Sequence, residues 1–326
     1  MIVLSSNEVA KLLPMQAAIR LVEKAMIAAS NGLATLPLRN AMDLGTPNIL
    51  GIMPGALEDP ACYGTKLISL YPDNPAKGHS SHLGLMVLFD KEFGVPTAIM
   101  NAGKLTAIRT AAASAVATRV LSRAGAEVLT VVGTGEQAHI HLEAMRAVRN
   151  IRELRVAGRT IDSAKRFADE TRKRYGDLTV TSTDSVQEAA TGADIIYTVT
   201  SSRDTVLHGD WVGEGCHVNA VGASIPSIRE IDQEMVLKAA LYVDYRPSAF
   251  AQAGEIIAAL NSGAMTEDHI LGEIGEVLQG KAKGRESDDS ITLYRSMGIA
   301  AQDLICAHHV MIEAGELGIG TDVSIM

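Results

Sequence analysis

A strand-like run that stops abruptly at two glycines constrains the fold of this chain more than any other feature. The run Val128–Ala138 reads V-L-T-V-V-G-T-G-E-Q-A, and a helix-prone segment, Glu136–Arg149, begins at once. In a dinucleotide-binding turn, Gly133 would permit the tight bend, Gly135 would let the backbone approach a pyrophosphate, and Ala138 would let helix and strand pack closely. The diphosphate would bind the N–H groups at the helix start. Glycine pairs also occur in ordinary turns, so the neighbouring pattern must support this interpretation.

The pattern after residue 127 does so, because short apolar runs alternate with helical segments. The expected strands are Val128–Val132, Glu153–Ala157, Leu178–Thr181, Ile195–Thr198 and His217–Val221, with Leu241–Asp244 as a further candidate. The expected helices are the one after Gly135, Ser163–Tyr175 and Ser185–Thr191. This alternation predicts an α/β fold with a Rossmann-type, doubly wound parallel sheet.

The segments on either side of this region have a different pattern. Two helices with a break near Pro14 are followed by five expected strands: Leu36–Ala41, Asn48–Pro54, Tyr63–Tyr71, Leu83–Asp90 and Val95–Asn101. They predict a mixed, largely antiparallel sheet. An alanine-rich helix, Leu105–Ser122, leads into the glycine turn, and Thr292–Glu316 is interpreted as one long amphipathic helix. We therefore expect a nucleotide domain, residues 121–291, inserted into a second α+β domain made of residues 1–120 and 292–326.

Composition and charge exclude several classes of function. At 326 residues and 47% hydrophobic composition, the chain can bury one or two full cores. No apolar run reaches the roughly 18 residues of a spanning helix, and no secretory signal is evident, so we expect a cytoplasmic protein without a membrane partner. A net charge of −9 without a basic stripe argues against nucleic-acid binding. Cys62, Cys216 and Cys306 are far apart, which fits reduced thiols and predicts no metal site.

The end of the second expected strand indicates which cofactor is bound. An acidic residue there holds a free ribose 2′-hydroxyl, whereas an Arg suits a 2′-phosphate. Here Leu154–Ala157 is followed by Gly158, Arg159 and Thr160, with no carboxylate at the tip. Arg159 and Thr160 could bind a phosphate, or they could be a solvated Arg and a helix-capping Thr. We favour NADP(H) and keep NAD(H) as the alternative.

Three cations upstream could form a carboxylate clamp. Arg39, Lys66 and Arg109 lie in the sheet-rich part, and the last two stand in apolar or small-residue text where an unpaired charge is costly. The alternative for each is a surface side chain that reaches solvent. His82 could touch a ligand or could be a hydrogen-bonded structural histidine.

Five motifs carry a family resemblance. They read G-T-K-L-I-S-L-Y-P-D-N, L-T-A-I-R-T-A-A-A-S-A-V-A-T, V-V-G-T-G-E-Q-A, N-A-V-G-A-S-I-P-S-I-R-E-I-D and T-L-Y-R-S-M-G-I-A-A-Q-D. In this order, and over nearly the whole chain, they resemble the ornithine cyclodeaminase and mu-crystallin family. The resemblance implies a Rossmann domain, a substrate domain that forms a homodimer, and a nicotinamide cofactor facing a small amino or imino acid.

The resemblance also implies roles for individual residues. Arg39, Lys66 and Arg109 match positions that bind the substrate carboxylate, while Glu255 and Ser296 match positions lining the substrate pocket. The cofactor positions it implies, taken with the glycine turn and the strand tip, are Ser81, His82, Arg109, Thr110, Gly133, Thr134, Gly135, Glu136, Gln137, Ala138, Gly158, Arg159, Thr160, Thr200, Ser201, Val221 and Ser224.

One departure from the family selects among its activities. The cyclodeaminases carry a catalytic Asp in their version of G-A-S-I-P, where this chain has Ser224, and a Ser cannot act as a carboxylate base. The sequence therefore predicts an NAD(P)H-dependent reductase of a small cyclic ketimine carboxylate, with Lys66 or an ordered water managing the proton. The alternatives are an ornithine cyclodeaminase, an alanine-type amino-acid dehydrogenase and a non-catalytic NADPH-binding protein.

Overall fold

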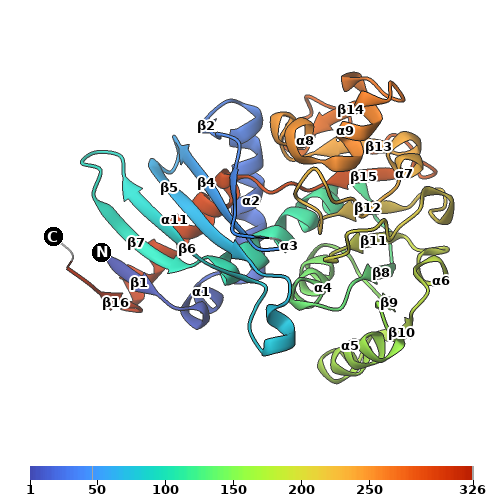
Figure 1. Ribbon diagram of the computed structural model, residues 1–326, viewed down its shortest axis with the longest axis horizontal. Coiled ribbons are helices and arrows are strands. Elements are labelled where there is room, and N and C mark those ends of the chain that lie inside the picture. The colour runs from blue at the N-terminus through green and yellow to red at the C-terminus, as the bar shows by residue number, and fades with distance from the viewer. Residues whose placement is uncertain (46, 325–326) are drawn as a thin grey trace. The chain divides into compact units, whose positions relative to one another are not determined.

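The chain divides into two compact units. The computed structural model describes residues 1–45 and 47–324 (Figure 1). Unit 1 comprises residues 1–112 and 298–326, and unit 2 comprises residues 113–297. The expected boundaries were 120 and 291, and Ile325 and Met326 of the expected second domain lie outside the described residues. The first unit boundary falls within α3 (Ala102–Leu121), so one continuous helix contributes to both units.

Unit 1 is built on a mixed sheet of order β16-β1-β7-β6-β5-β4-β2, with β3 paired to β4. Its strands are β1 (Ile2–Leu4), β2 (Ala34–Thr35), β3 (Asn40–Asp43), β4 (Ile49–Leu57), β5 (Cys62–Leu70), β6 (His82–Asp90), β7 (Pro96–Asn101) and β16 (Thr321–Asp322). Only the pairing of β1 with β7 is parallel among the described strands of this sheet. The largely antiparallel sheet predicted from the sequence is therefore present.

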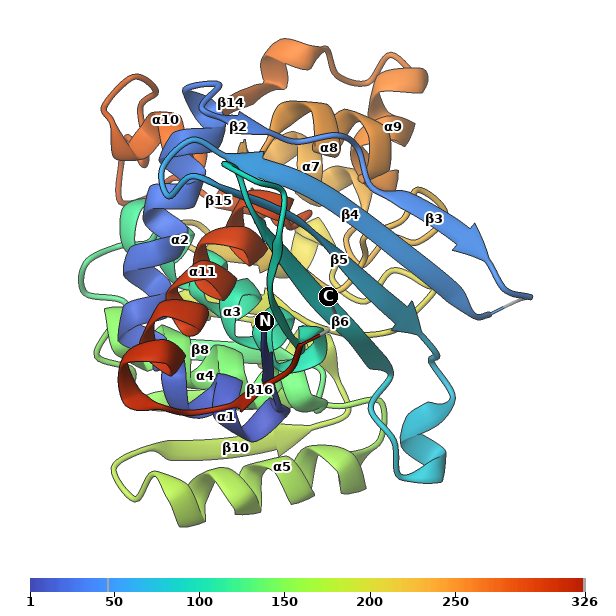
Figure 2. The ribbon, with the colours of Figure 1, turned by 90° about the vertical axis from the view of Figure 1, so that its left-hand side faces the viewer.

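Helices cover one face of this sheet. Unit 1 contains α1 (Ser6–Leu12), α2 (Met15–Ser30), α11 (Ala300–Leu317) and the short 3-10 helix η1 (Asn74–Lys77). Figure 2 shows α2 and α11 side by side, and α11 packs on β4, β5 and β6. Gly55 of β4 permits this approach, because a Cβ there would lie 2.8 Å from the Cβ of Ala300. Helix α11 thus lies directly on the central strands of the sheet.

Unit 2 is a parallel sheet of order β10-β9-β8-β11-β12-β15-β13-β14. Its strands are β8 (Val128–Val132), β9 (Glu153–Ala157), β10 (Thr179–Thr183), β11 (Ile195–Thr198), β12 (His217–Ala220), β13 (Ala240–Val243), β14 (Ile270–Glu273) and β15 (Thr292–Arg295). Its helices are α4 (Glu136–Val148), α5 (Ile161–Arg174), α6 (Val186–Ala190), α7 (Gln233–Lys238), α8 (Arg246–Gln252), α9 (Gly254–Asn261), α10 (Ile274–Leu278), η2 (Gly209–Trp211) and η3 (Glu267–His269).

The strand order of unit 2 is that of a doubly wound fold. From β8 the chain adds β9 and β10 on one side and then crosses to β11 and β12 on the other. The loops after β8 and β11 therefore diverge, and ligands of such sheets bind outside the carboxyl ends of the strands at this switch point. The α/β fold predicted from the sequence is confirmed.

Two expected elements differ from the structure. Residues 36–39 form no strand, and the strand expected from Leu36 begins at Asn40, where β3 pairs with β4. Pro37 explains the shift, because proline cannot donate a ladder hydrogen bond. The helix expected over Thr292–Glu316 is instead β15 followed by α11. Gly298, with φ of +70°, separates them, and all four residues of β15 are buried, as in a central parallel strand.

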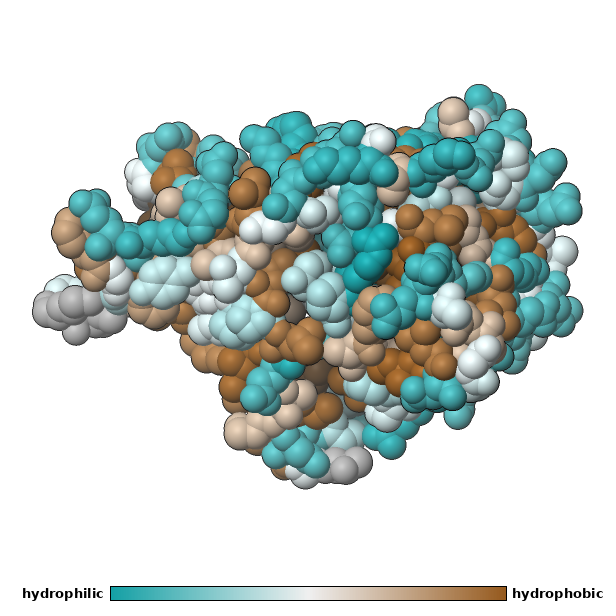
Figure 3. All heavy atoms as spheres, turned by 90° about the horizontal axis from the view of Figure 1, so that it is seen from above, coloured by the Kyte–Doolittle hydropathy of each residue, from teal (hydrophilic) through white to brown (hydrophobic). Residues whose placement is uncertain are grey.

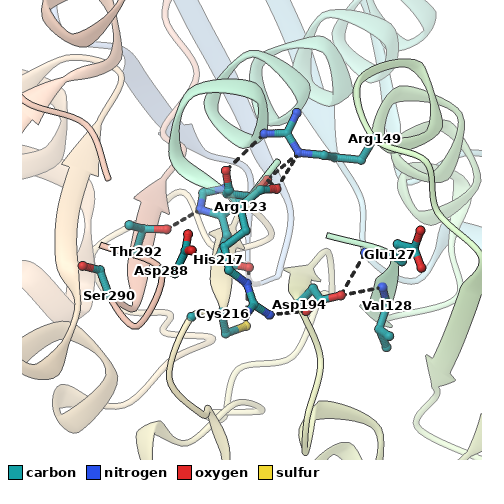
Figure 4. A network of polar contacts seen from close by, with 12 residues as sticks. Arg123, Glu127, Val128, Arg149, Asp194, Cys216, His217, Asp288, Ser290 and Thr292 are labelled. Atoms are coloured by element: carbon teal, nitrogen blue, oxygen red, sulfur yellow. Dashed lines mark hydrogen bonds and ion pairs between the residues drawn. The ribbon is translucent and has the colours of Figure 1, made fainter. Parts of the chain in front are cut away.

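The amino ends of the strands in unit 2 are closed by a polar network (Figure 4). The Asp194 carboxylate accepts hydrogen bonds from the Arg123 guanidinium and from the backbone N–H groups of Glu127 and Val128. Arg149 donates to the carbonyl groups of Thr118, Ser122 and Arg123, at the end of α3 and just after it. Two surface hollows at this edge, of about 390 and 380 Å³, contain none of the predicted site residues.

The described helices include none that is both long enough and apolar enough to span a membrane.

Candidate active site

Two of the predicted cations lie together in unit 1 around a buried carboxylate. Lys66 on β5 donates from Nζ to both oxygens of Asp303 on α11, at 3.0 and 2.9 Å. Arg109 on α3 donates from Nε to the same carboxylate at 2.9 Å, and from Nη1 to Oε1 of Gln302 at 3.0 Å. Lys66 and Arg109 are only 1% and 4% exposed, so they are not side chains that reach solvent.

The third cation reaches the same region through a backbone carbonyl. Arg39 donates from Nη2 to the carbonyl oxygen of Gly298 at 3.0 Å. Gly298 also lies against Arg109, because a Cβ at this position would be 2.5 Å from the Nη1 of Arg109. The cluster of Arg39, Lys66, Arg109 and Asp303, called the cation cluster below, therefore joins β5, α3, α11 and the segment before β3.

The charges of the cation cluster do not cancel. Burial and the nearby Arg109 and Arg39 cations lower the pKa of Lys66 to about 7, and Asp303 only partly opposes them. Burial raises the pKa of Asp303, but the Arg109 and Lys66 cations outweigh it and hold that pKa below its usual value. Lys66 and Arg109 thus share the single carboxylate of Asp303. An anionic ligand group would compensate the excess positive charge.

In unit 2 the glycine turn has the geometry that a dinucleotide requires. Gly133 has φ of +117°, and a Cβ there would lie 2.9 Å from the carbonyl oxygen of Val199. Gly135 is the N-cap of α4, has no side-chain cap, and would place a Cβ in open space. Ala138 is fully buried behind it. The start of α4 therefore offers backbone N–H groups and room for a diphosphate.

The strand tip predicted to select the cofactor lies between β9 and α5. Gly158 is required there because a Cβ would lie 2.6 Å from Oγ of Ser163. Thr160 is the N-cap of α5, and its hydroxyl accepts a hydrogen bond from the N–H of Ser163 at 3.3 Å, so the capping role considered from the sequence is present. Arg159 is exposed beside it, and the nearest carboxylate in sequence is Asp162, within α5. The tip of β9 therefore carries an exposed cation and no carboxylate before Asp162.

The loops after β11 and β12 carry the remaining predicted cofactor positions of unit 2 and share one buried carboxylate. Glu230 is 2% exposed. Its Oε1 accepts from the N–H and the hydroxyl of Thr200, both at 2.7 Å, and its Oε2 accepts from the Thr198 hydroxyl at 2.9 Å and from the N–H of Gly222. The loops that contain Ser201 and Val221 are therefore tied to each other.

Glu255 and Ser296, the two expected pocket residues, lie beside a second buried ion pair. The Glu255 carboxylate accepts a hydrogen bond from Nε of Arg295. Arg295 also donates to the carbonyl groups of Ala220 and Ala223, at 3.2 and 2.6 Å. The N–H of Ser296 donates to the carbonyl of Ala220. Both expected residues are buried. Their contacts with Arg295 and Ala220 support the loop that contains Ser224.

The other predicted positions lie in both units. Ser81 Oγ lies 2.9 Å from Nδ1 of the exposed His82, and Thr110 follows Arg109 on α3. Thr134, Glu136 and Gln137 surround the start of α4. Across the described ranges 1–45 and 47–324, no group of three His, Cys, Asp or Glu side chains could hold a metal ion.

Sequence reasoning assigned no role to three buried ionic residues that organise these sites. They are Asp303, Glu230 and Arg295. Each lies in one of the motifs that carry the family resemblance, but only Asp303 and Arg295 stand in apolar text, whereas Glu230 stands beside Arg229 and near Asp232. A buried charge needs a partner, so this signal could have identified Asp303 and Arg295 as members of ion networks, but not which partners they have.

Comparison with known proteins identifies relatives over the whole chain. The ketimine reductase mu-crystallin of Mus musculus is 40% identical over 258 residues, 79% of this chain and 78% of the relative. A structure of the Thermococcus litoralis Δ1-pyrroline-2-carboxylate reductase with NADH and L-proline is 37% identical, with a TM-score of 0.95 over 99% of this chain and 100% of that one. An archaeal alanine dehydrogenase dimer with bound NAD is 32% identical, with a TM-score of 0.93 over 100% and 99%.

The family profile agrees with these similarities. It is described as the ornithine cyclodeaminase/mu-crystallin family, and it matches residues 1–316. With the parallel sheet, the glycine turn and the cation cluster in place, this match decides the classification: the chain belongs to the ornithine cyclodeaminase/mu-crystallin family.

Proposed function

We propose that this protein is an NAD(P)H-dependent reductase of a small cyclic ketimine carboxylate. The substrates proposed are Δ1-pyrroline-2-carboxylate and Δ1-piperideine-2-carboxylate, and the products are L-proline and L-pipecolate. The observation that carries the proposal is the buried cation cluster with its excess of positive charge, in a chain whose other unit has a dinucleotide turn. Relatives named ketimine reductase and Δ1-pyrroline-2-carboxylate reductase support it.

The reaction needs a hydride, a proton and a fixed substrate. The nicotinamide cofactor, when bound, supplies the hydride to the imine carbon, and a proton must reach the nitrogen to give the secondary amine. Arg39 and Arg109 would hold the substrate carboxylate through charge-assisted hydrogen bonds. Lys66, with a pKa near 7, would hold or deliver the proton, directly or through a water. Because these groups hold the substrate in place, the reaction step no longer has the entropy cost of bringing the reactants together in solution.

Ser224 argues against ornithine cyclodeamination, because that reaction requires a carboxylate base at this position. An alanine-type dehydrogenase is the second candidate, and the similarity to the archaeal alanine dehydrogenase favours it. That enzyme class reduces an open-chain keto acid together with ammonia, so the two candidates differ in whether ammonia is required.

The reaction is tested by following NADPH oxidation with freshly made Δ1-pyrroline-2-carboxylate in the absence of ammonia. We expect turnover, and we expect Arg109→Ala to lower kcat/KM by about a hundredfold or more because the carboxylate is then misplaced. Arg119→Ala, on the exposed side of the same helix, is the matched control. Oxidation only with pyruvate plus ammonia would favour the dehydrogenase, and release of ammonia from ornithine would favour the lyase.

The pKa of Lys66 predicts a pH dependence. The ammonium form is present below its pKa of about 7 and is lost above it, so kcat/KM is expected to fall as the pH rises through this region. In Lys66→Arg the charge persists to high pH, and the alkaline decline should move upward even if the rate is lower. Titration of the substrate imine affects both proteins equally. A wild-type profile that is flat from pH 6 to about 9, or identical alkaline limbs, would contradict this role for Lys66.

We propose that NADPH is preferred over NADH because of Arg159 at the tip of β9. The solved relatives named above contain NADH or NAD, so this preference is a property proposed for the present chain alone. Arg159→Ala should raise the KM for NADPH about tenfold to a hundredfold through loss of a charged hydrogen bond, with little effect on NADH. Arg166→Ala, exposed on α5, is the control. If the ratio of the two KM values is unchanged, Arg159 is a solvated side chain that does not bind the 2′-phosphate.

We propose a homodimer formed through the uncovered face of the sheet in unit 1. Figure 3 shows hydrophobic side chains, in brown, reaching the surface among hydrophilic ones. Leu83 and Leu85 on β6 are 45% and 48% exposed, on the sheet whose other face is covered by α2 and α11. A family relative is named as a dimer. Such exposed apolar strands are typical of subunit interfaces.

The dimer is tested by light scattering on purified protein. Wild-type protein should have twice the 34.5 kDa mass of one chain, and Leu85→Glu should shift it towards the mass of one chain because a charge would be buried in the interface. Leu271→Glu introduces the same charge at another exposed leucine, in β14 of unit 2, and should leave the mass unchanged. A single-chain mass for the wild type, or a dimer that persists in Leu85→Glu, would contradict the proposal.

A further inference from the structure

The loops after β11 and β12 are joined by a carboxylate that the proposed reaction does not use directly. Glu230 receives two hydrogen bonds from Thr200, one from Thr198 and one from Gly222. Four donors fill the acceptor positions of an ionised carboxylate. Two of these donors are backbone N–H groups, one in each loop, and they contact different oxygens of the same side chain.

Strand order indicates which part of the cofactor these loops would contact. A dinucleotide fold consists of two mononucleotide halves on either side of the switch point. The half formed by β8, β9 and β10 contains the glycine turn and Arg159, which are the pyrophosphate and adenosine positions. The half that begins with β11 and β12 is therefore the nicotinamide side, and Glu230 lies at its carboxyl edge.

We infer that Glu230 is a positioning residue that fixes the two loops holding the nicotinamide end of the cofactor, and this inference rests on the proposed function. Two contacts show how closely the second loop is held. A Cβ on Gly222 would lie 2.5 Å from Oε1 of Glu230, so only glycine fits against the carboxylate. On the other side of the second loop, Arg295 binds the carbonyl of Ala223 at 2.6 Å. The backbone around Val221 is thus held from both sides.

A carboxylate is required at this position, and the isosteric amide cannot replace it. In Glu230→Gln one oxygen becomes an NH₂ group, which cannot accept a hydrogen bond. Whichever way the amide turns, it faces either the N–H of Thr200 or the N–H of Gly222. The hydroxyl groups of Thr198 and Thr200 can rotate to accept, but a backbone N–H cannot. One loop therefore loses its anchor in either orientation, and an unsatisfied buried donor remains.

The experiment compares two ligands that differ only in the nicotinamide end. The Kd values of NADPH and of the fragment 2′-phosphoadenosine 5′-diphosphate, which lacks the whole nicotinamide riboside, are measured by calorimetry for the full-length protein. We expect Glu230→Gln to weaken NADPH binding about tenfold and to change the Kd of the fragment by less than about twofold. A purely structural role for Glu230 would weaken both ligands together.

The matched control is Asp232→Asn. Asp232 also accepts two backbone N–H hydrogen bonds, from Gly209 and Met235, but it caps α7 and contacts the far end of the first loop, at His208, and not Thr200 or Gly222. It should leave the ratio of the two Kd values unchanged. If Glu230→Gln does not fold, Thr198→Val removes a single donor to Glu230 and should change the same ratio in the same direction by a few fold.

Two results would overturn the inference: equal weakening of both ligands by Glu230→Gln, or no weakening of either. The proposed function fails differently. A wild-type protein that binds both ligands but reduces no ketimine would overturn the proposed reaction while the two Kd values still decide the role of Glu230. A wild-type protein that binds the fragment and NADPH with equal affinity would overturn the inference, because no contact with the nicotinamide would then contribute.

Discussion

The carboxylate of Asp303 is the interaction on which unit 1 depends. Removing one partner from a buried ion pair costs on the order of 3–5 kcal/mol, so Lys66 and Arg109 could not both be buried without it. Asp303 is 237 residues from Lys66 and 194 from Arg109. The carboxylate can reach them only if the chain, after completing unit 2, returns and places α11 on the sheet of unit 1. Electrostatics and topology therefore impose the same requirement, and the insertion of unit 2 follows from it.

Unit 2 uses the same device at the carboxyl ends of its strands. Glu230 joins two loops by accepting hydrogen bonds, and Arg295, paired with Glu255, joins the second of these loops to β15 by donating them. In unit 2 the buried charges of Glu230 and Arg295 hold loop backbone, and in unit 1 the buried charge of Asp303 holds two cationic side chains. Sites that are held in this way are preorganised, so a ligand binds without first having to order the loops.

The sequence predicted the elements with local signals and missed the partners that are distant in sequence. The bounds of β8, β9 and β11 agree with the expected strands, because buried parallel strands form continuous apolar runs that end at glycines or turns. Lys66 and Arg109 stood out as cations in apolar text, but no periodicity shows which carboxylate neutralises them. The sequence pattern predicted a helix over Thr292–Arg295 because a buried run of four residues is too short to show whether its apolar residues repeat as in a strand or as in the helix that follows. Gly298 was the available signal for the break between β15 and α11. Its φ of +70° is a backbone conformation that favours glycine and cannot continue a helix.

The charges around Ser224 explain why a carboxylate base would be unfavourable at this position in this chain. Ser224 follows Ala223, whose carbonyl is bound by Arg295. This guanidinium pairs with the carboxylate of Glu255 and also interacts electrostatically with the carboxylate of Glu230. An aspartate at 224 would add a third negative charge beside them. Its pKa would rise, so a smaller fraction of the carboxylate would be ionised and able to accept a proton unless another cation entered the network. Proton management for the proposed reaction then falls to the part of the protein with excess positive charge, the cation cluster, where Lys66 has a pKa of about 7 and can exchange a proton near neutral pH. A positively charged donor is suited to reducing an imine, because protonation of the imine nitrogen makes its carbon a better hydride acceptor.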